Sequence, residues 1–251
     1  MEPSASTPIG LPRLELPGDL HRWEEIHSAH SVVYISGDLV WKEFSSEVCA
    51  VAEANVYALL HNDPTQAKFF PRARGFNRTG DSLYICMERI GDRTLQDIID
   101  GDIPRSETNV SAILGGITTS LDALHAYYGC IHRDLKPANV FVTESNHMRL
   151  ADFSLSRSIG PGHGPASGSH EYISEVITMW YRPPELMSAG SAAYGSEVDI
   201  WSLGAIMVQF LFPRLFNRIF CHSNETTMLA SLNVNIPGLG RTDEFLSMAP
   251  G

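Results

Sequence analysis

The sequence predicts an α+β fold of two lobes: a small β-rich lobe that contains one helix, and a larger, mainly helical lobe. In the first ninety residues, short apolar runs follow the strand period of two, and one helical stretch interrupts them. After Gly91 the runs lengthen and follow the helical period. We therefore expect a leader at 1–20, a first lobe at 21–90 and a second lobe at 91–251.

The size and the charge of the chain narrow its class. Its 251 residues, 43% hydrophobic and 19% charged, can form two lobes that each have a packed core. A net charge of −11 argues against broad binding to nucleic acid or to an anionic membrane. The longest apolar stretch, near 200–212, is too short to span a bilayer. The scattered cysteines form no C-x-x-C pair, which argues against zinc and favours an intracellular compartment, the cytoplasm and/or the nucleus.

The first lobe is expected to combine a hairpin, a helix and a strand. Residues 1–20 hold four prolines and few periodic apolar positions, which indicates a flexible leader. Residues 31–44 contain two β-rich runs, SVVYIS and LVWKEF, joined by a Gly-Asp pair, which predicts a hairpin. Helical apolar spacing marks 46–60, and 83–89 (LYICMER) is predicted as a strand.

The second lobe is expected to be built around a long helix at 106–128, with Ser106 as the candidate N-cap and Gly129 as the stop. The other expected elements are short helices at 95–99 and 226–232, strands at 140–142 and 148–151, a mobile Gly-, Pro- and Ser-rich loop at 158–169 and an apolar helix at 197–212. Helices therefore dominate this half of the chain.

The most informative segment lies at 130–142 and reads CIHRDLKPANVFV. It places five polar or charged side chains within eight positions, between apolar segments, which a solvated loop explains poorly. Asp134 can orient an attacking hydroxyl and accept its proton, and Asn139 can bind a metal ion that bridges phosphates. Lys136 can neutralise charge on the transferring group. A carboxylate and an asparagine at this spacing, in a loop between a helix and a strand, suit phosphoryl transfer.

HRDLKPANV resembles the catalytic loop of the eukaryotic protein kinases, serine/threonine type, and further matches follow in the family's order. Asp152, in Asp-Phe-Ser, lies thirteen residues after Asn139, where the family has Asp-Phe-Gly. The resemblance implies that Asp152 and Asn139 hold Mg²⁺. It also implies that Asp199, in VDIWSLGAIM, binds the backbone near His132, the alternative being a charge favoured by the helix dipole. The matches cover roughly 26–212 and imply a two-lobed protein-kinase-like fold.

The same resemblance implies a site for ATP. Lys42, in LVWKEF, looks like the strand lysine that grips the α- and β-phosphates, although a lysine on a strand is usually a solvated residue. Glu53 on the next helix would be its ion-pair partner. Glu47 is the competitor, because the eleven-residue gap from Lys42 to Glu53 is short for the family. The hinge that would bind the adenine edge matches Met87, Glu88, Arg89 and Ile90.

The segment SEVITMWYRPPELM is similar to the cyclin-dependent and mitogen-activated branch of the family. Lys136 after Asp134, and Thr178 before the Trp-Tyr-Arg run, are features of serine/threonine kinases. The branch implies a protein substrate with Ser or Thr and proline-directed choice, and a regulatory protein partner is a further expectation. The helix at 46–60 lacks the motif that identifies cyclin-dependent kinases, which argues against cyclin dependence.

Three departures from the family bear on nucleotide handling. The place of the glycine-rich loop, 26–34, contains no glycine, which should weaken ATP binding or turnover because side chains keep backbone N–H groups from the phosphates. Val40 replaces a small alanine and should crowd the adenine site. Ser154 replaces the glycine of the metal motif, and we expect it to bias the loop toward one conformation without removing Mg²⁺ binding.

A fourth departure concerns activation. Ile173 stands where the branch has its activating phosphothreonine, so we expect activity that does not depend on phosphorylation at this position. Arg133, which would pair with that phosphate, needs another partner. The candidates are Glu171, Glu175 and a phosphate on Tyr172 or Ser174.

The end of the chain departs from the family as well, because only about forty residues follow the helix at 197–212. We expect the second lobe to be truncated or divergent after about residue 212. Glu185, in YRPPEL, would need an arginine partner, for which the candidates are Arg214, Arg218 and Arg241. Five apolar residues there form either a buried cluster or a docking surface. They are Phe210, Phe212, Leu215, Phe216 and Phe220.

Three functions fit these patterns to different degrees. An ATP- and Mg²⁺-dependent serine/threonine protein kinase is favoured because its catalytic groups are all present. A catalytically weak pseudokinase that acts as a binding scaffold is the alternative, which the missing glycines, Val40 and the short C-terminal part favour. A small-molecule phosphotransferase shares the Asp and Asn spacing but should lack the LKP and WYRPPE runs.

Overall fold

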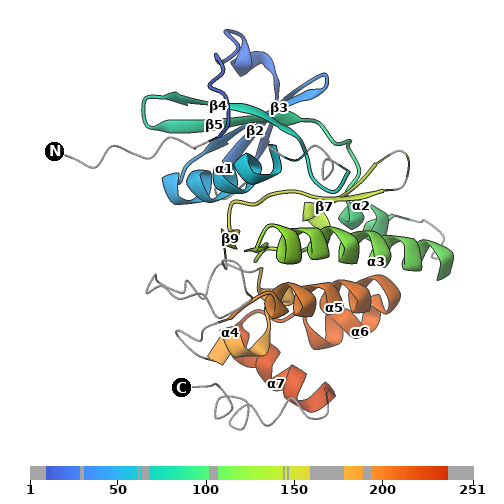
Figure 1. Cartoon of the computed structure of the whole chain (residues 1–251). Coiled ribbons are helices and arrows are strands. Elements are labelled where there is room, and N and C mark those ends of the chain that lie inside the picture. Colours follow the sequence, from blue (N-terminus) through green and yellow to red (C-terminus); the bar gives the residue numbers. More distant parts are fainter. Residues whose placement is uncertain are drawn as a thin grey trace.

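The protein has two lobes, with a β-rich lobe above a helical one, which confirms the expected α+β arrangement (Figure 1). The computed structural model describes residues 10–28, 31–61, 63, 68–101, 107–143, 145, 147–158, 178–188 and 194–236. Within these residues, every helix is too short or too polar to cross a membrane.

The upper lobe is an antiparallel sheet of strand order β1-β2-β3-β5-β4, and helix α1 (Glu47–His61) packs against one face of it (Figure 1). Its strands are β1 (Glu24–His27), β2 (Ser31–Ser36), β3 (Leu39–Phe44), β4 (Ala73–Thr79) and β5 (Ser82–Glu88). The expected hairpin is confirmed as β2 and β3, whose turn holds Gly37 at φ 55°, a conformation that favours glycine. Periodicity missed β1 because all four of its residues are exposed and none of the alternation that marks a half-buried strand is present.

Residues 12–14, within the stretch expected to be a flexible leader, lie along the outer edge of β4. Leu14 N donates to Phe76 O at 2.8 Å, and Phe76 N donates to Pro12 O at 2.9 Å. Leu11 is buried, and a 3₁₀ turn over Leu20–Arg22 leads into β1. The approach is so close that a Cβ at Gly75 would lie 2.3 Å from Pro12 O. Residues 12–14 of the expected leader are thus paired with β4, and residues 1–9 lie outside the described residues.

The lower lobe is built from helices and short strand pairs (Figure 1). Its helices are α2 (Leu95–Asp100), α3 (Glu107–Asp122), α4 (Pro184–Ser188), α5 (Glu197–Leu211), α6 (Pro213–Ile219) and α7 (Glu225–Asn235). Its strand pairs are β6 (Cys130–Ile131) with β9 (Arg157–Ser158), and β7 (Val140–Val142) with β8 (Met148–Leu150). Helix α3 continues as a π-helical turn over Ala123–Tyr127 and stops at Gly129, whose φ is 59°. Ser106 and the expected loop beyond residue 158 lie outside the described residues.

After residue 212 the chain folds back as α6, which packs on α5, and as α7, which packs on α6 and α4. Periodicity predicted only part of α7. Phe210, Phe216 and Phe220 are buried, and the last two stack at 5.1 Å between ring centroids. Phe212, in contrast, is 58% exposed. The buried cluster is therefore the correct interpretation for three of the five apolar residues. Leu215 packs partly buried against the same core.

Candidate active site

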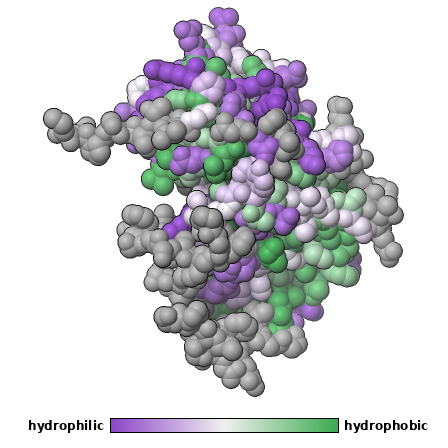
Figure 2. Space-filling view, in the orientation of Figure 1, coloured by the Kyte–Doolittle hydropathy of each residue, from purple (hydrophilic) through white to green (hydrophobic). Residues whose placement is uncertain are grey.

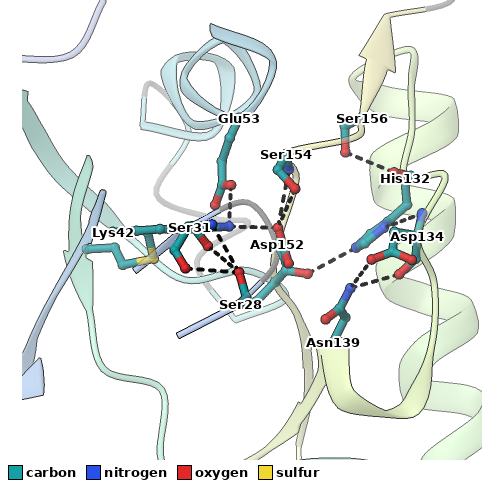
Figure 3. Close-up of polar contacts among 12 residues, drawn as sticks. Ser28, Ser31, Lys42, Glu53, His132, Asp134, Asn139, Asp152, Ser154 and Ser156 are labelled. Atoms are coloured by element: carbon teal, nitrogen blue, oxygen red, sulfur yellow. Dashed lines mark hydrogen bonds and ion pairs between the residues drawn. The ribbon is translucent and has the colours of Figure 1, made fainter. Parts of the chain in front are cut away.

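The loop between β6 and β7 brings Lys136 and Asn139 to the carboxylate of Asp134. Figure 3 shows the contact between Asn139 and Asp134. Asp134 is buried, and its Oδ2 accepts hydrogen bonds from Lys136 Nζ at 2.6 Å and from Asn139 Nδ2 at 3.1 Å. Its Oδ1 accepts one from Thr178 Oγ1 at 2.8 Å. Asn139 Nδ2 also donates to the Asp134 carbonyl, so the Asn139 amide oxygen is the atom left for a cation. The arrangement fixes the carboxylate in one orientation.

On the side of the β-rich lobe, Lys42 of β3 joins α1 to the Asp-Phe-Ser segment (Figure 3). Its Nζ lies 2.7 Å from Glu53 Oε2 and 2.7 Å from Asp152 Oδ1. Glu47, the competing partner, pairs instead with Arg78 at the surface. Burial would lower the pKa of Lys42, but the two carboxylates raise it above its ordinary value. Burial also acts to raise the pKa of Asp152, but Lys42 holds it well below its usual range, so both groups are charged.

A column of aromatic rings fixes the segment next to Asp152. Phe153 is fully buried. The centroid of its ring lies 5.5 Å from that of Tyr57 on α1, 5.8 Å from that of Phe70 and 5.3 Å from that of His132. The column joins α1, the Asp-Phe-Ser segment and the catalytic loop. Asp152 itself has φ 66°, a left-handed conformation that is unusual for a residue other than glycine. The sequence patterns did not single out Tyr57, because its position on α1 is that of any core residue.

Asp199 of α5 supports the catalytic loop from below, as the resemblance implied. It is fully buried and accepts hydrogen bonds from His132 N at 2.7 Å and from Arg133 N at 2.9 Å. His125 Nε2, in the π-helical turn, lies 2.7 Å from the same carboxylate. Burial acts to raise the pKa of Asp199, but His125 and the backbone N–H groups lower it. Sequence reasoning missed His125, whose partner lies 74 positions away.

The side chain of Arg133 donates to two hydrogen-bond acceptors within the part of the chain that the structure describes. Its Nε donates to Leu155 O at 2.5 Å, and its Nη1 donates to Tyr194 Oη at 2.8 Å. Its φ of 67° is left-handed, so the residue depends on such contacts for its conformation. The activation position and its neighbours lie outside the described residues. They are Glu171, Tyr172, Ile173, Ser174 and Glu175.

The place of the glycine-rich loop is a hairpin between β1 and β2 that serine side chains close. Ser28 N donates to Ser31 O at 2.9 Å, Ser31 N donates to Ser28 Oγ at 3.1 Å, and the two hydroxyls lie 2.9 Å apart (Figure 3). Next to it, Val40 pairs with Met87 across β3 and β5. Both features put side chains where the family has glycine or alanine.

The hinge residues form the end of β5 and the two positions after it, at the junction of the lobes. Met87 is buried, and Glu88 Oε1 accepts from Arg149 Nη1 at 2.7 Å, which ties β5 to β8 of the lower lobe. Arg89 forms an ion pair with Asp92, and Ile90 follows it. A pocket of about 500 Å³ borders this segment. It is lined by Asp38, Arg89, Ile90, Gly91, Asp92, Thr143 and Ser145, so it is separate from the catalytic carboxylates.

The residues present suit Mg²⁺ held jointly with a phosphate. Among the described residues, no group of three or more His, Cys, Asp or Glu side chains could hold a metal alone. Mg²⁺ commonly takes one or two protein ligands, with phosphates and waters for the rest. Asp152 has an oxygen, Oδ2, that is used in none of the hydrogen bonds among the described residues, and Asn139 has its amide oxygen. These two atoms fit such a site.

Glu185 has none of its expected arginine partners within the described residues. The ion pairs there do not join it to Arg214 or Arg218, and Arg241 lies outside the described residues. Burial raises the pKa of Glu185 above its ordinary value. The neighbouring Arg182 pairs instead with Glu225 of α7. Helix α7 thus anchors the segment that follows Thr178.

A β-rich lobe over a helical lobe, with a charged lysine–carboxylate pair facing a fixed aspartate, defines a protein kinase domain. The model of the protein kinase domain matches residues 51–237, and the chain belongs to the protein kinase family. Its fold resembles that in the crystal structure of the yeast RNA Pol II CTD kinase CTDK-1 complex, with a TM-score of 0.61 and 23% identity. That match covers 77% of this chain and 60% of the other.

Curated relatives agree with the branch that the sequence indicated. The putative cyclin-dependent kinase F-2 of Oryza sativa subsp. japonica is 37% identical over 131 residues, 51% of this chain and 38% of that protein. Cyclin-dependent kinase 14 of Homo sapiens is 37% identical over 103 residues, 41% of this chain and 20% of that protein. The chain thus spans well under half the length of these relatives.

Proposed function

We propose that the chain is an ATP-dependent protein kinase that transfers the γ-phosphoryl group to Ser or Thr hydroxyls of a protein. The observation that carries the proposal is the Asp134 carboxylate, fixed by Lys136, Asn139 and Thr178, opposite the pair of Lys42 and Asp152. The first set suits a hydroxyl nucleophile and the second a nucleotide, which are the two halves of phosphoryl transfer.

On the substrate side, Asp134 orients the hydroxyl and accepts its proton. Thr178 and Asn139 hold the carboxylate in place, which removes the need to reorganise it during the reaction. Lys136, whose Nζ lies 2.6 Å from Asp134, offsets the negative charge of the transferring group. The resemblance to the cyclin-dependent and mitogen-activated branch favours a proline after the target residue.

On the nucleotide side, Lys42 binds the α- and β-phosphates while Glu53 holds its ammonium group in position. Asp152 and Asn139 would hold Mg²⁺, which would neutralise the charge of the phosphates. The hinge at Met87, Glu88, Arg89 and Ile90 binds the adenine edge through backbone groups other than Glu88 N and Arg89 N, which donate to Arg72 O and Asp38 O. The lobe boundary then falls at Gly91, directly after this hinge.

A regulatory protein partner would fit the exposed side of α1. Val48 is 78% exposed and Leu59 45% exposed, and Val51 and Ala52 lie half-buried between them. Apolar groups at this spacing form one stripe along a helix. The matched relatives are named cyclin-dependent kinases, so a cyclin-like protein is the class of partner that we propose, although the sequence lacks the usual cyclin-binding motif. All the cysteines are free, in agreement with a reducing compartment such as the cytoplasm or the nucleus.

A radiolabelled phosphate-transfer assay tests the function. Wild type is compared with Asp134→Asn on a generic basic protein and on a Ser/Thr-Pro peptide, alone and with candidate cyclins. We expect Asp134→Asn to lower the rate by roughly 10²- to 10⁴-fold, the range for loss of a general base. An equal, near-zero rate for both proteins, with no thermal shift from Mg·ATP, would favour the scaffold function, which the glycine-free hairpin at Ser28 and Ser31 would then explain.

A further inference from the structure

Ser154, which replaces the usual glycine, is bonded to the carboxylate of the proposed metal site. Ser154 Oγ donates to Asp152 Oδ1 at 2.7 Å, and Ser154 N lies 3.4 Å from the same oxygen (Figure 3). Lys42 Nζ donates to this oxygen too, at 2.7 Å. Oδ1 of Asp152 therefore accepts all of these hydrogen bonds, and Oδ2 accepts none from the described residues.

Lys42 is a shared anchor of Asp152, because it also binds Glu53 and, under the proposed function, phosphate. Its Nζ donates to Glu53 and to Asp152, so only the third of its three N–H groups is left for a phosphate, whose charge would draw the ammonium group away from Asp152. The Asp152 side chain is 36% exposed, and the terminal torsion of an aspartate is broad, so the carboxylate turns easily without a fixed donor. Ser154 is the donor that does not have to move.

The contact with Ser154 also stabilises the backbone conformation of Asp152. Asp152 has φ 66°, which costs free energy for a residue with a side chain. A carboxylate that accepts a hydrogen bond from two residues further on supports this conformation. The Ser154 hydroxyl adds a second, shorter bond to the same oxygen. A glycine at position 154 would keep the backbone N–H and lose the hydroxyl.

We propose that Ser154 is a positioning residue that holds Oδ1 of Asp152 and thereby leaves Oδ2 as the oxygen that binds Mg²⁺ with the nucleotide. The inference rests on the proposed function, because it needs nucleotide at this site. A purely structural role of Ser154 would affect nucleotide binding with and without Mg²⁺. The positioning role affects only the Mg²⁺-dependent binding.

The test titrates Mg²⁺ into protein mixed with fluorescent mant-ADP and records the Mg²⁺ concentration at half-saturation. Ser154→Ala should raise that concentration about tenfold, the factor expected for one charge-assisted hydrogen bond. Ser154→Thr keeps the hydroxyl and should stay within about twofold of wild type. The matched control is Ser158→Ala, an exposed serine in the same segment. Affinity for mant-ADP in EDTA should change by less than about twofold in every variant, since Ser154 acts through the metal ligand.

A second measurement addresses the backbone. Hydrogen exchange of residues 152–156 should be faster in Ser154→Gly than in Ser154→Ala, because glycine adds backbone freedom to the loss of the hydroxyl. The inference is overturned if Ser154→Ala keeps the wild-type Mg²⁺ requirement, or if Ser154→Thr is as impaired as Ser154→Ala. If the variants behave in this way but the wild-type protein binds mant-ADP in a Mg²⁺-dependent manner, only this inference fails and the proposed function is retained. Wild type that binds no nucleotide overturns both.

Discussion

Replacing Asp199 should detach the catalytic loop from α5, and the cost can be worked from the contacts. The side chain is fully buried. Its Oδ2 accepts from His132 N at 2.7 Å and contacts His125 Nε2 at 2.7 Å, and its Oδ1 accepts from Arg133 N at 2.9 Å. Alanine leaves these groups buried without an acceptor, at about 1–3 kcal/mol each. Relief of the buried charge offsets part of that sum, so we expect Asp199→Ala to cost about 3–5 kcal/mol.

The substitution Asp199→Asn separates the contribution of the charge to stability from that of the side-chain shape. The amide oxygen of the asparagine can replace Oδ2 and keep two of the contacts, but its NH₂ group then faces Arg133 N, a second donor. We expect Asp199→Asn to cost about 2 kcal/mol and to lower phosphate transfer, because Arg133 at φ 67° loses its support. The exposed Glu197 on the same helix is the matched control, and Glu197→Ala should cost under about 1 kcal/mol.

Urea unfolding followed by tryptophan fluorescence gives the free energies, and the transfer assay is run where each variant is folded. These losses are a large fraction of the stability of a typical domain, about 5–15 kcal/mol, so they are easily measured. The reasoning fails if Asp199→Ala lies within about 1 kcal/mol of wild type, or if Asp199→Asn is no more stable than Asp199→Ala.

The remaining predictions concern α1, Arg133 and the N-terminal residues. Glu53→Gln should lower mant-ADP affinity about tenfold by releasing Lys42, whereas Glu47→Gln should change it by less than about twofold; equal effects would contradict the pairing. Phosphatase-treated wild type should keep its transfer rate. Tyr194→Phe should lower that rate about fivefold without changing KM for ATP, because Arg133 loses the hydroxyl that accepts its hydrogen bond. Gly75→Ala should expose the backbone of the N-terminal residues to hydrogen exchange, because a Cβ there meets a carbonyl oxygen; unchanged protection would contradict the close packing.

The sequence predicted those parts of the site that lie within short segments. The catalytic loop was read from 130–142 alone, because a dense set of polar residues between apolar runs has few structural explanations. The two-lobed arrangement followed from the change of period at Gly91. The ion pair of Lys42 was narrowed to two glutamates, and only the fold shows which of them faces inward.

Contacts between distant segments were beyond the reach of periodicity. Tyr57, His125 and Tyr194 reach the site through side chains whose partners lie 61–96 positions away, and nothing in their local pattern marks them. The pairing of the N-terminal residues with β4 uses backbone hydrogen bonds, which carry no side-chain signal. The prolines of that segment suggested disorder. The residues between them nevertheless keep their backbone N–H groups, and Leu14 N donates to β4.

That pairing has a practical consequence for anyone who shortens the protein. In the sheet order, β4 is the outermost strand, and residues 12–14 cover the side of it that would otherwise present unpaired N–H and C=O groups. A fragment cut where the family match begins, at residue 51, would lack this cover as well as β1 to β3. Even a cut at residue 21 would open a strand to which another molecule can add, so such fragments should self-associate during purification, and recombinant versions should retain residues 10–20.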